Sequence, residues 1–403
     1  MSQTTEKLHL NDSLLFDFEA RVADLSDYMG KPSVVLDRTA FYGESGGQLG
    51  DRGNLNDGKA TAVVVDTQID DQGRNHHLLS APVAWEKGQP LTGRVDEAHR
   101  RDMMSQHTAQ HMLSAAFWQI GKMETLSARL GRETSTIDLD AVQLDDPVIR
   151  QVEDRVNGLI LEDRPIRPLY PDEVQLKQLG LRRPPKVTRD IRLIEVEQFD
   201  ITPCGGTHCH RTGQVGPARI VSLERYKGIT RVTFVAGARA LAYFRTRDEL
   251  LRDTARELGC GAPEILDVFA SLRRENRDLS QTLGKTRAEL IAHLCHQLHG
   301  EHPPQDGGFT PIPVLRPEDD LASMRKLVSA LAARDDVFAL GACRDAKSGD
   351  WAVVVERGSS VQRHVGQWFR DKSQALGGRG GGRPERAEGR WPADMDWDSL
   401  DFS

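Results

Sequence analysis

Two pairs of metal-ligand residues place the strongest constraint on how this chain folds. Within each pair the ligands are four residues apart, and the pairs are His107 and His111 in HTAQH and Cys204 and His208 in PCGGTHCH. Residues 102–120 contain good helix formers and no proline or glycine, so the first two imidazoles project from one helix face. Gly205 and Gly206 let the backbone bend tightly enough for the second pair to converge. A fold that joins both pairs offers three imidazole nitrogens and one thiolate.

This donor set predicts one zinc ion per chain, because nitrogen and sulfur ligands suit zinc better than calcium or magnesium. Thr108 follows His107 where the HExxH motif of metalloproteases has glutamate, which excludes that class of enzyme. Two kinds of site remain open. One is a closed structural site, and the other lets water or substrate replace His208 or another ligand. Cys209 and His210 are adjacent spare donors that are able to substitute for a ligand.

The composition indicates a protein without membrane-spanning segments. A chain of 403 residues has room for two to four domains, and its 53 Lys and Arg against 60 Asp and Glu give a net charge of −7. Nucleic-acid binding, if present, is therefore local. No run approaches the ~20 apolar residues of a spanning helix, and the N-terminus lacks signal-peptide features. Five scattered cysteines argue against a disulfide framework. We expect a cytoplasmic protein with no membrane partner.

The hydrophobic pattern changes along the chain and predicts an α+β multidomain protein. Short apolar runs between glycine-rich turns indicate a small β-barrel or sandwich, and a helical period follows it. The linker EHPPQDGG precedes a last α/β unit. The expected divisions are a β-barrel domain at 1–95, an α/β zinc-binding domain at 96–240, a helical connector at 241–300, an α/β C-terminal domain at 309–391 and a flexible acidic tail at 392–403.

The helical connector contains a heptad seam. Its positions alternate spacings of three and four, and they are Phe269, Leu272, Asn276, Leu279, Leu283, Thr286 and Leu290. Such a seam either packs on its own domain or forms an intermolecular coiled coil, and Asn276 is able to fix the register in both cases. A homodimer through this connector or through the C-terminal domain is therefore one expected assembly.

Two basic segments are the natural candidates for contacts with RNA phosphates. Residues 164–192 carry eight basic and three acidic side chains, and residues 363–390 carry seven and three. A solvated surface is the alternative interpretation. The expected tRNA-binding residues are Arg182, Arg183, Arg379 and Arg383. Gly377–Gly382 either lets RNA approach the backbone closely or forms a flexible loop.

Further motifs give the chain a family resemblance. HTAQH, CGGTHCHRTGQVG and KGITRVTFVAG resemble the editing domain of alanyl-tRNA synthetases and of their AlaX-type relatives. FYGESGGQLGDRG, residues 41–53, is similar to the glycine-rich motif of the β-barrel before that domain. GGRGGGRPERAEG, residues 377–389, resembles the signature of the C-terminal DHHA1-like domain that the synthetases share with DHH-type phosphoesterases. Because about 40 residues precede FYGESGGQ, the chain resembles a long-form, freestanding editing protein that acts in trans.

The resemblance implies a hydrolase that deacylates tRNA(Ala) mischarged with serine, or with glycine, and spares alanyl-tRNA(Ala). The zinc ligands that it implies are His107, His111, Cys204 and His208. The catalytic residues expected from it are His107, His111, Cys204, Gly205 and Gly206. The backbone N–H groups of the two glycines are expected to stabilise the oxyanion of acyl transfer. Whether zinc activates water or anchors the substrate stays open, and anchoring with electrostatic help is the preferred hypothesis.

The resemblance also places STIDLD beside the amino-acid pocket. Thr134, Ser135 and Thr136 carry hydroxyls that pair with a seryl side chain and that alanine would leave unsatisfied. Hydroxyls exposed on a β-strand are the alternative. The residues expected to line the substrate entrance are Gly46, Gly47 and Gln48, and turn geometry alone is the alternative role of the two glycines.

Two other functions fit the same residues. The first is a non-catalytic tRNA-binding protein with a structural zinc site, which would bind tRNA without ester hydrolysis. The second is a zinc hydrolase of a small aminoacyl or peptide substrate, which would be active without tRNA and would need no basic C-terminal domain.

Overall fold

The computed structural model describes residues 4–185, 191–226, 228–303, 308–398 and 400–402. They fold into two compact units, Met1–Asp253 and Thr254–Ser403. The chain is a mixed α+β protein with several domains, as the sequence predicts. Within the described ranges, no helix combines the length and the apolar character that crossing a bilayer requires.

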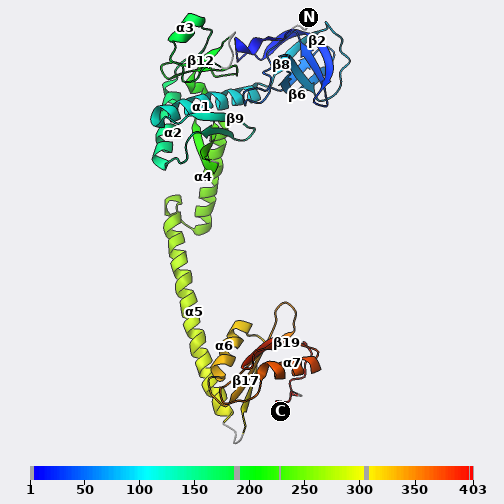
Figure 1. The fold of residues 1–403 in the computed structure, drawn as a ribbon, viewed down its shortest axis with the longest axis vertical. Coiled ribbons are helices and arrows are strands. Elements are labelled where there is room, and N and C mark those ends of the chain that lie inside the picture. Colours follow the sequence, from blue (N-terminus) through cyan, green and yellow to red (C-terminus); the bar gives the residue numbers. More distant parts are fainter. Residues whose placement is uncertain (1–3, 186–190, 227, 304–307, 399, 403) are drawn as a thin grey trace. The chain divides into compact units, whose positions relative to one another are not determined.

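The first unit begins with a small closed β-barrel, which confirms the prediction (Figure 1). Its strands, in the order in which neighbours pair, are β2 (Asp17–Tyr28), β3 (Lys31–Leu36), β7 (Asn75–Leu79), β6 (Thr61–Ile69), β5 (Gly53–Asn56) and β8 (Pro90–Val95). Alternate residues of β8 are buried, because successive side chains of a strand point to opposite faces. Two short strands, β1 (Glu6–Lys7) and β4 (Arg38–Thr39), pair outside the barrel.

A buried ion pair fastens the glycine-rich loop of the barrel to the helix that follows. Arg100 and Asp51 are both fully buried, and the Nε of Arg100 donates to Oδ1 of Asp51 over 3.1 Å. The same carboxylate accepts the backbone N–H of Tyr42. Removing either partner would leave the other charge buried and unpaired, which is strongly destabilising. The pair therefore fixes the position of the loop relative to the helix.

That helix, α1 (Glu97–Gly121), forms the centre of the next domain. It starts where the side chain of Asp96 accepts the N–H of His99, and it ends at Lys122 in the left-handed conformation. Its apolar side packs on α2 (Asp146–Glu162) and on a four-stranded sheet. In order of pairing, the strands of that sheet are β14 (Ala218–Tyr226), β15 (Ile229–Ala236), β10 (Ser135–Leu139) and β9 (Thr125–Leu130).

A smaller sheet carries the second pair of ligands. It consists of β11 (Ile166–Leu169), β12 (Leu193–Val196) and β13 (Asp200–Pro203). Leu193 lies opposite Pro203, so the hairpin leads directly into Cys204. The short helix α3 (Glu173–Gln178) lies in the connection between β11 and β12, and α4 (Ala238–Leu258) follows β15.

The second unit is an α/β domain preceded by the long helix α5 (Ile265–Glu301). Its sheet, in order of pairing, contains β16 (Thr310–Leu315), β17 (Val337–Arg344), β18 (Trp351–Arg357), β20 (Arg386–Trp391) and β19 (Arg379–Gly382). The helices α6 (Leu321–Leu331) and α7 (Val365–Ala375) complete the domain. Most of Gly377–Gly382 is therefore the edge strand β19 and not a loop. A Cβ at Gly380 would lie 2.5 Å from the ring of Phe369, so close packing requires glycine there.

The segment after β20 differs from the flexible tail that we expected. Met395, Trp397 and Phe402 pack against the hydrophobic cluster of the domain, and the ring of Phe402 stacks on Trp368 with centroids 6.1 Å apart. The acidic residues of this segment predict a solvated tail. The aromatic side chains between them nevertheless supply the apolar surface that packs the segment against the domain.

Candidate functional site

The four predicted ligands converge in the first unit. His107 and His111 come from adjacent turns of α1, whereas Cys204 and His208 come from the turn after β13. Their ligand atoms all lie within 4.8 Å of one another. The Sγ of Cys204 is 3.4 Å from Nε2 of His107 and 3.2 Å from Nε2 of His208. Zinc–nitrogen and zinc–sulfur bonds are about 2.0–2.3 Å long, so the donor types and their close spacing are compatible with a zinc site.

Burial keeps the three histidines in the form that binds metal. It lowers the pKa of His107 and His208 well below the ordinary value, and it lowers the pKa of His111 to about 4. Neutral imidazoles therefore prevail at neutral pH. Burial also raises the pKa of the Cys204 thiol, while the N–H of Gly206 and the charge of Arg192 oppose that rise. A bound cation would complete the shift to thiolate.

The two spare donors do not join the ligands. Cys209 lies in the hydrophobic core, where burial raises its pKa to about 11. The Nε2 of His210 lies 3.6 Å from a carboxylate oxygen of Asp12, and its side chain is 46% exposed. The metal-ligand cluster of the described chain contains neither residue.

Gln48 occupies a different place from the predicted substrate entrance. It is fully buried behind His107, whose Nδ1 lies 2.7 Å from Oε1 of Gln48. The same oxygen accepts the N–H of Thr207, and the amide Nε2 donates to the hydroxyl of Thr207. With its oxygen on Nδ1, Gln48 selects the tautomer of His107 that leaves Nε2 free to bind metal. Nothing in the motif FYGESGGQ indicates this partnership, since 59 residues separate the two side chains.

Replacing Gln48 with leucine is expected to weaken zinc binding about 10- to 100-fold, because partners that orient a ligand histidine contribute that much to metal affinity. Competition with a chromophoric chelator would measure the change. Gln110→Leu is the matched control, since the amide of Gln110 donates to Ser114 and not to a ligand. Equal zinc affinity in Gln48→Leu and the unaltered chain would contradict the role of Gln48.

The glycines of the two motifs have distinct surroundings. A Cβ at Gly206 would lie 2.2 Å from the ring of His107, whereas a Cβ at Gly205 would meet nothing within 4 Å. Gly47 has a φ of +87° and lies against the backbone of Ala128, so the backbone conformation of the glycine-rich loop requires glycine at this position. Gly46 lines the cavity beside the ligands. The N–H of Gly206 points to Sγ of Cys204 at 3.4 Å.

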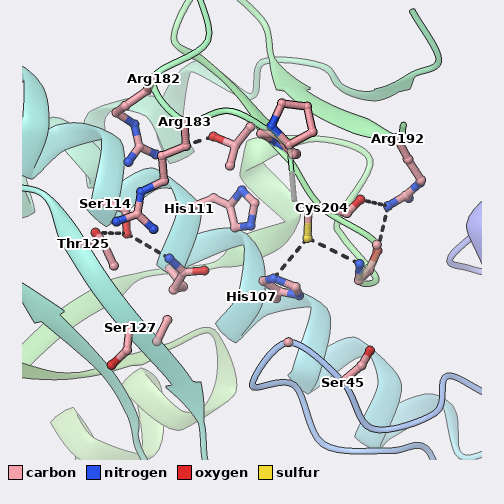
Figure 2. Close-up of a pocket in the computed structure, with 18 of the residues that line it drawn as sticks. Ser45, His107, His111, Ser114, Thr125, Ser127, Arg182, Arg183, Arg192 and Cys204 are labelled. Atoms are coloured by element: carbon pink, nitrogen blue, oxygen red, sulfur yellow. Dashed lines mark hydrogen bonds between the residues drawn. The ribbon is translucent and has the colours of Figure 1, made fainter. Parts of the chain in front are cut away.

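A cavity of about 620 Å³ opens over three of the four ligands, His107, His111 and Cys204, and Figure 2 shows the side chains around it. Its polar lining is of two kinds. The hydroxyl groups belong to Tyr42, Ser45, Ser114, Thr125, Ser127 and Thr202, and the guanidinium groups belong to Arg182, Arg183 and Arg192. The lining, as far as the structure describes it, includes no Asp or Glu, so the cavity is cationic even before a metal binds.

Thr134, Ser135 and Thr136 are not among the residues that line this cavity. Thr134 is exposed, and Ser135 is buried in β10 with a hydroxyl that has no hydrogen-bond partner. The neighbouring strand β9 supplies Thr125 and Ser127 to the cavity instead. Sequence reasoning missed them, although Ser114 follows His111 by three residues, a spacing that marks the same helix face.

The predicted RNA-binding arginines fall into two groups. Arg182 forms an ion pair with Asp200, with Nη2 and Oδ2 3.3 Å apart, and only 10% of its side chain is exposed. Arg183 reaches into the cavity towards the hydroxyl groups (Figure 2). Burial of Arg183 and the nearby charge of Arg182 lower the pKa of the Arg183 guanidinium. Arg379 and Arg383 are exposed in the second unit, on β19 and directly after it.

Comparison with protein families matches two segments. Residues 8–99 match the model of tRNA synthetases class II (A), and residues 191–233 match the threonyl and alanyl tRNA synthetase second additional domain. The first segment contains the barrel and Gln48, and the second contains Cys204 and His208. Gln48 and the second ligand pair therefore lie in matched segments, whereas His107 and His111 on α1 lie outside both.

Among curated proteins, the alanine–tRNA ligase of Halorubrum lacusprofundi is 30% identical over 98% of this chain and 43% of its own length. That of Methanosarcina acetivorans is 29% identical over 96% of this chain and 42% of its own length. The chain thus spans less than half of these relatives. The solved C-Ala domain of Aquifex aeolicus alanyl-tRNA synthetase aligns with 24% of this chain and 88% of that domain, at 22% identity. Its TM-score of 0.22 is too low to support a structural assignment.

The matched segments indicate a relative of class II aminoacyl-tRNA synthetases that shares the second additional domain of the threonyl and alanyl enzymes. More narrowly, the chain is an AlaX-like relative of the alanyl-tRNA synthetases.

Proposed function

We propose that the protein is a zinc-dependent aminoacyl-tRNA hydrolase that releases serine, and also glycine, from mischarged tRNA(Ala) and spares alanyl-tRNA(Ala). The cavity carries this proposal, because it joins a His/His/Cys/His metal cluster to hydroxyl groups and guanidinium groups without a carboxylate. The similarity to alanyl-tRNA synthetases supports tRNA(Ala) as the RNA.

The charge of the lining favours an ester attached to RNA over a small free ester. A free aminoacyl ester and an aminoacyl-tRNA carry the same cationic amine, which the guanidinium groups of Arg183 and Arg192 would repel, so a substrate with compensating anionic groups is favoured. The phosphates at the end of a tRNA would be attracted by the same groups. Arg183 is the proposed phosphate contact in the cavity, and Arg379 and Arg383 are the proposed contacts in the second unit.

An aminoacyl ester is already activated, so the site chiefly has to position it and to stabilise the oxyanion of acyl transfer. Bound zinc would supply Lewis-acid polarisation of the substrate. The residues of the chain would hold the ester over the cluster, place its side chain against the hydroxyl groups of α1 and β9, and offer a backbone N–H from the turn after β13.

The hydroxyl groups of Ser114 and Thr125 are the proposed serine-selective contact. The Oγ of Ser114 accepts both the amide of Gln110 and the hydroxyl of Thr125, each over 2.8 Å. Ser114 therefore keeps its own proton to donate, and Thr125 keeps a lone pair to accept the hydroxyl of a seryl group. An alanyl side chain would leave that proton and that lone pair without a partner.

Replacing Thr125 with valine is expected to lower the preference for Ser-tRNA(Ala) over Ala-tRNA(Ala) about fivefold, since one neutral hydrogen bond contributes roughly 1 kcal/mol. The ratio of kcat/KM values for the two substrates measures it. Ser127→Ala is the matched control, because the hydroxyl of Ser127 is engaged with Asp138 over 2.7 Å. Unchanged selectivity in Thr125→Val would remove this contact from the proposal.

The function itself is tested by incubating the zinc-loaded protein with Ser-, Gly- and Ala-tRNA(Ala) and with the methyl ester of serine. Release of serine and glycine from tRNA, with alanine spared, is the expected result. Binding of tRNA without release would favour the non-catalytic protein with a structural zinc. Hydrolysis of the methyl ester at the rate of the tRNA ester would favour a small-substrate hydrolase.

The assembly that we propose is a homodimer through α5. The seam residues Phe269, Leu272, Leu279, Leu283 and Leu290 are exposed on this helix. A polar Asn276 at one position of such a seam fixes the register of paired helices. Sedimentation of the purified chain would distinguish a dimer from a single chain of 44.9 kDa.

A further inference from the structure

Arg192 is a buried cation beside the metal-ligand cluster, and its hydrogen-bond partners among the described residues are carbonyl groups alone. The residue is 9% exposed, and its Nη1 donates to the carbonyl oxygens of Cys204 and Gly206 over 2.8 and 3.0 Å (Figure 2). Its Nε is buried without a hydrogen-bond partner. Within the described residues no carboxylate pairs with it. Burying an uncompensated charge costs several kcal/mol, so the position calls for a functional explanation.

The backbone places Arg192 there. Leu193 lies opposite Pro203 in the β12–β13 hairpin, so the next pair outward is Arg192 and Cys204. The N–H of Cys204 donates to the carbonyl of Arg192 over 3.1 Å. Arg192 therefore forms hydrogen bonds with the turn through both its main chain and its side chain. These bonds restrict the rotation of the peptide groups in the turn.

Because a peptide group is planar and trans, holding its carbonyl in place also fixes the direction of its N–H. The carbonyl of one residue and the N–H of the next point in opposite directions. The peptide between Gly206 and Thr207 shows the consequence, because Arg192 holds its carbonyl while Gln48 accepts its N–H on the other side over 3.2 Å. In the peptide between Cys204 and Gly205, Arg192 holds the carbonyl in the same way.

The N–H of Gly205 then faces away from Arg192 and, within the described residues, has no acceptor. Gly205 lines the cavity, and the space at its Cα is open. The N–H of Gly206 is directed at Sγ of Cys204 and is not available. Of the two backbone donors predicted from the sequence, only that of Gly205 therefore stays available at the cavity lining among the described residues.

We propose that Arg192 is a positioning residue that aims the N–H of Gly205 at the carbonyl oxygen of the bound ester, and that this N–H is the oxyanion donor of the site. The proposal rests on the ester hydrolysis proposed above and assigns a role to a residue outside the ligand motifs. Because a single nitrogen of Arg192 holds both carbonyls, lysine is able to replace it in part, whereas methionine is not.

The test compares Arg192→Met, Arg192→Lys and the unaltered chain at saturating zinc, with zinc content measured for each. Loss of an oxyanion donor typically lowers kcat by about 10²–10³. We expect such a loss in Arg192→Met with KM changed less than about threefold, and partial recovery in Arg192→Lys. Arg192→Met that keeps the kcat of the unaltered chain would overturn the proposal.

A second readout does not depend on activity. In the ¹⁵N-labelled, zinc-loaded protein, free L-serine places a carboxylate oxygen where the ester carbonyl would lie, so the amide signal of Gly205 is expected to shift. Arg192→Met should lose this shift, whereas Arg167→Met, whose side chain is 61% exposed on the same small sheet and does not line the cavity, should keep it. The same shift in Arg192→Met, or none in the unaltered chain, would overturn the proposal. A shift that depends on Arg192 in a protein that hydrolyses no aminoacyl-tRNA would instead overturn the proposed function alone.

Discussion

Replacing Cys204 with alanine is expected to remove bound zinc and to lower serine release from Ser-tRNA(Ala) by about three orders of magnitude. Cys204 is the single anionic donor of the cluster, and its Sγ lies within 3.4 Å of two of the three imidazoles. Without it, three neutral nitrogens would hold the ion. The loss of the metal withdraws several kcal/mol of transition-state stabilisation, which corresponds to a factor of this size. Zinc content by atomic emission and single-turnover deacylation are the measurements.

Cys209→Ala is the matched control for that substitution. The two thiols are five positions apart in the same motif, but Cys209 lies in the hydrophobic core and outside the ligand cluster. It is expected to keep zinc and most of the activity, with some loss of stability from the missing side chain. If Cys209→Ala loses zinc and Cys204→Ala retains it, the ligand set is wrong.

The parts of the fold that the sequence predicts well depend on local pattern. The spacing of His107 and His111 predicts one face of a helix, and α1 provides it. The change from short apolar runs to a helical period near residue 96 coincides with the end of the barrel at β8. These features follow from backbone periodicity, which a single segment contains in full.

The parts that the sequence could not supply depend on tertiary packing. β9 and β10 are adjacent strands that both carry hydroxyls, and only the packing of the sheet against α1 decides that Thr125, and not Ser135, lines the cavity. Arg182 belongs to a basic segment, but its charge is matched by Asp200 on β13. Charge counting along a segment cannot detect a partner that the fold brings from elsewhere.

The same limit applies to the ligand environment. Arg192 and Gln48 hold the turn from opposite sides, and neither lies in the HTAQH or CGGTHCH motif. Spacing rules identify groups that bind an ion directly. The groups that orient those ligands approach from other strands and loops, so they become visible only in the folded chain.

Replacing Gly206 with alanine is expected to lower deacylation about 100-fold and to reduce zinc occupancy, whereas Gly205→Ala should bind zinc as the unaltered chain does. The two glycines are adjacent, but a Cβ at Gly206 would lie 2.2 Å from the His107 ring and 2.9 Å from Oε1 of Gln48. Both neighbours are buried, so the overlap has to displace the imidazole or the turn, and a displacement near 1 Å costs about 10² in rate. Zinc titration and deacylation of both variants would measure this. Full zinc occupancy in Gly206→Ala, or equal loss in both variants, would show that the close approach to His107 does not set the geometry of the site.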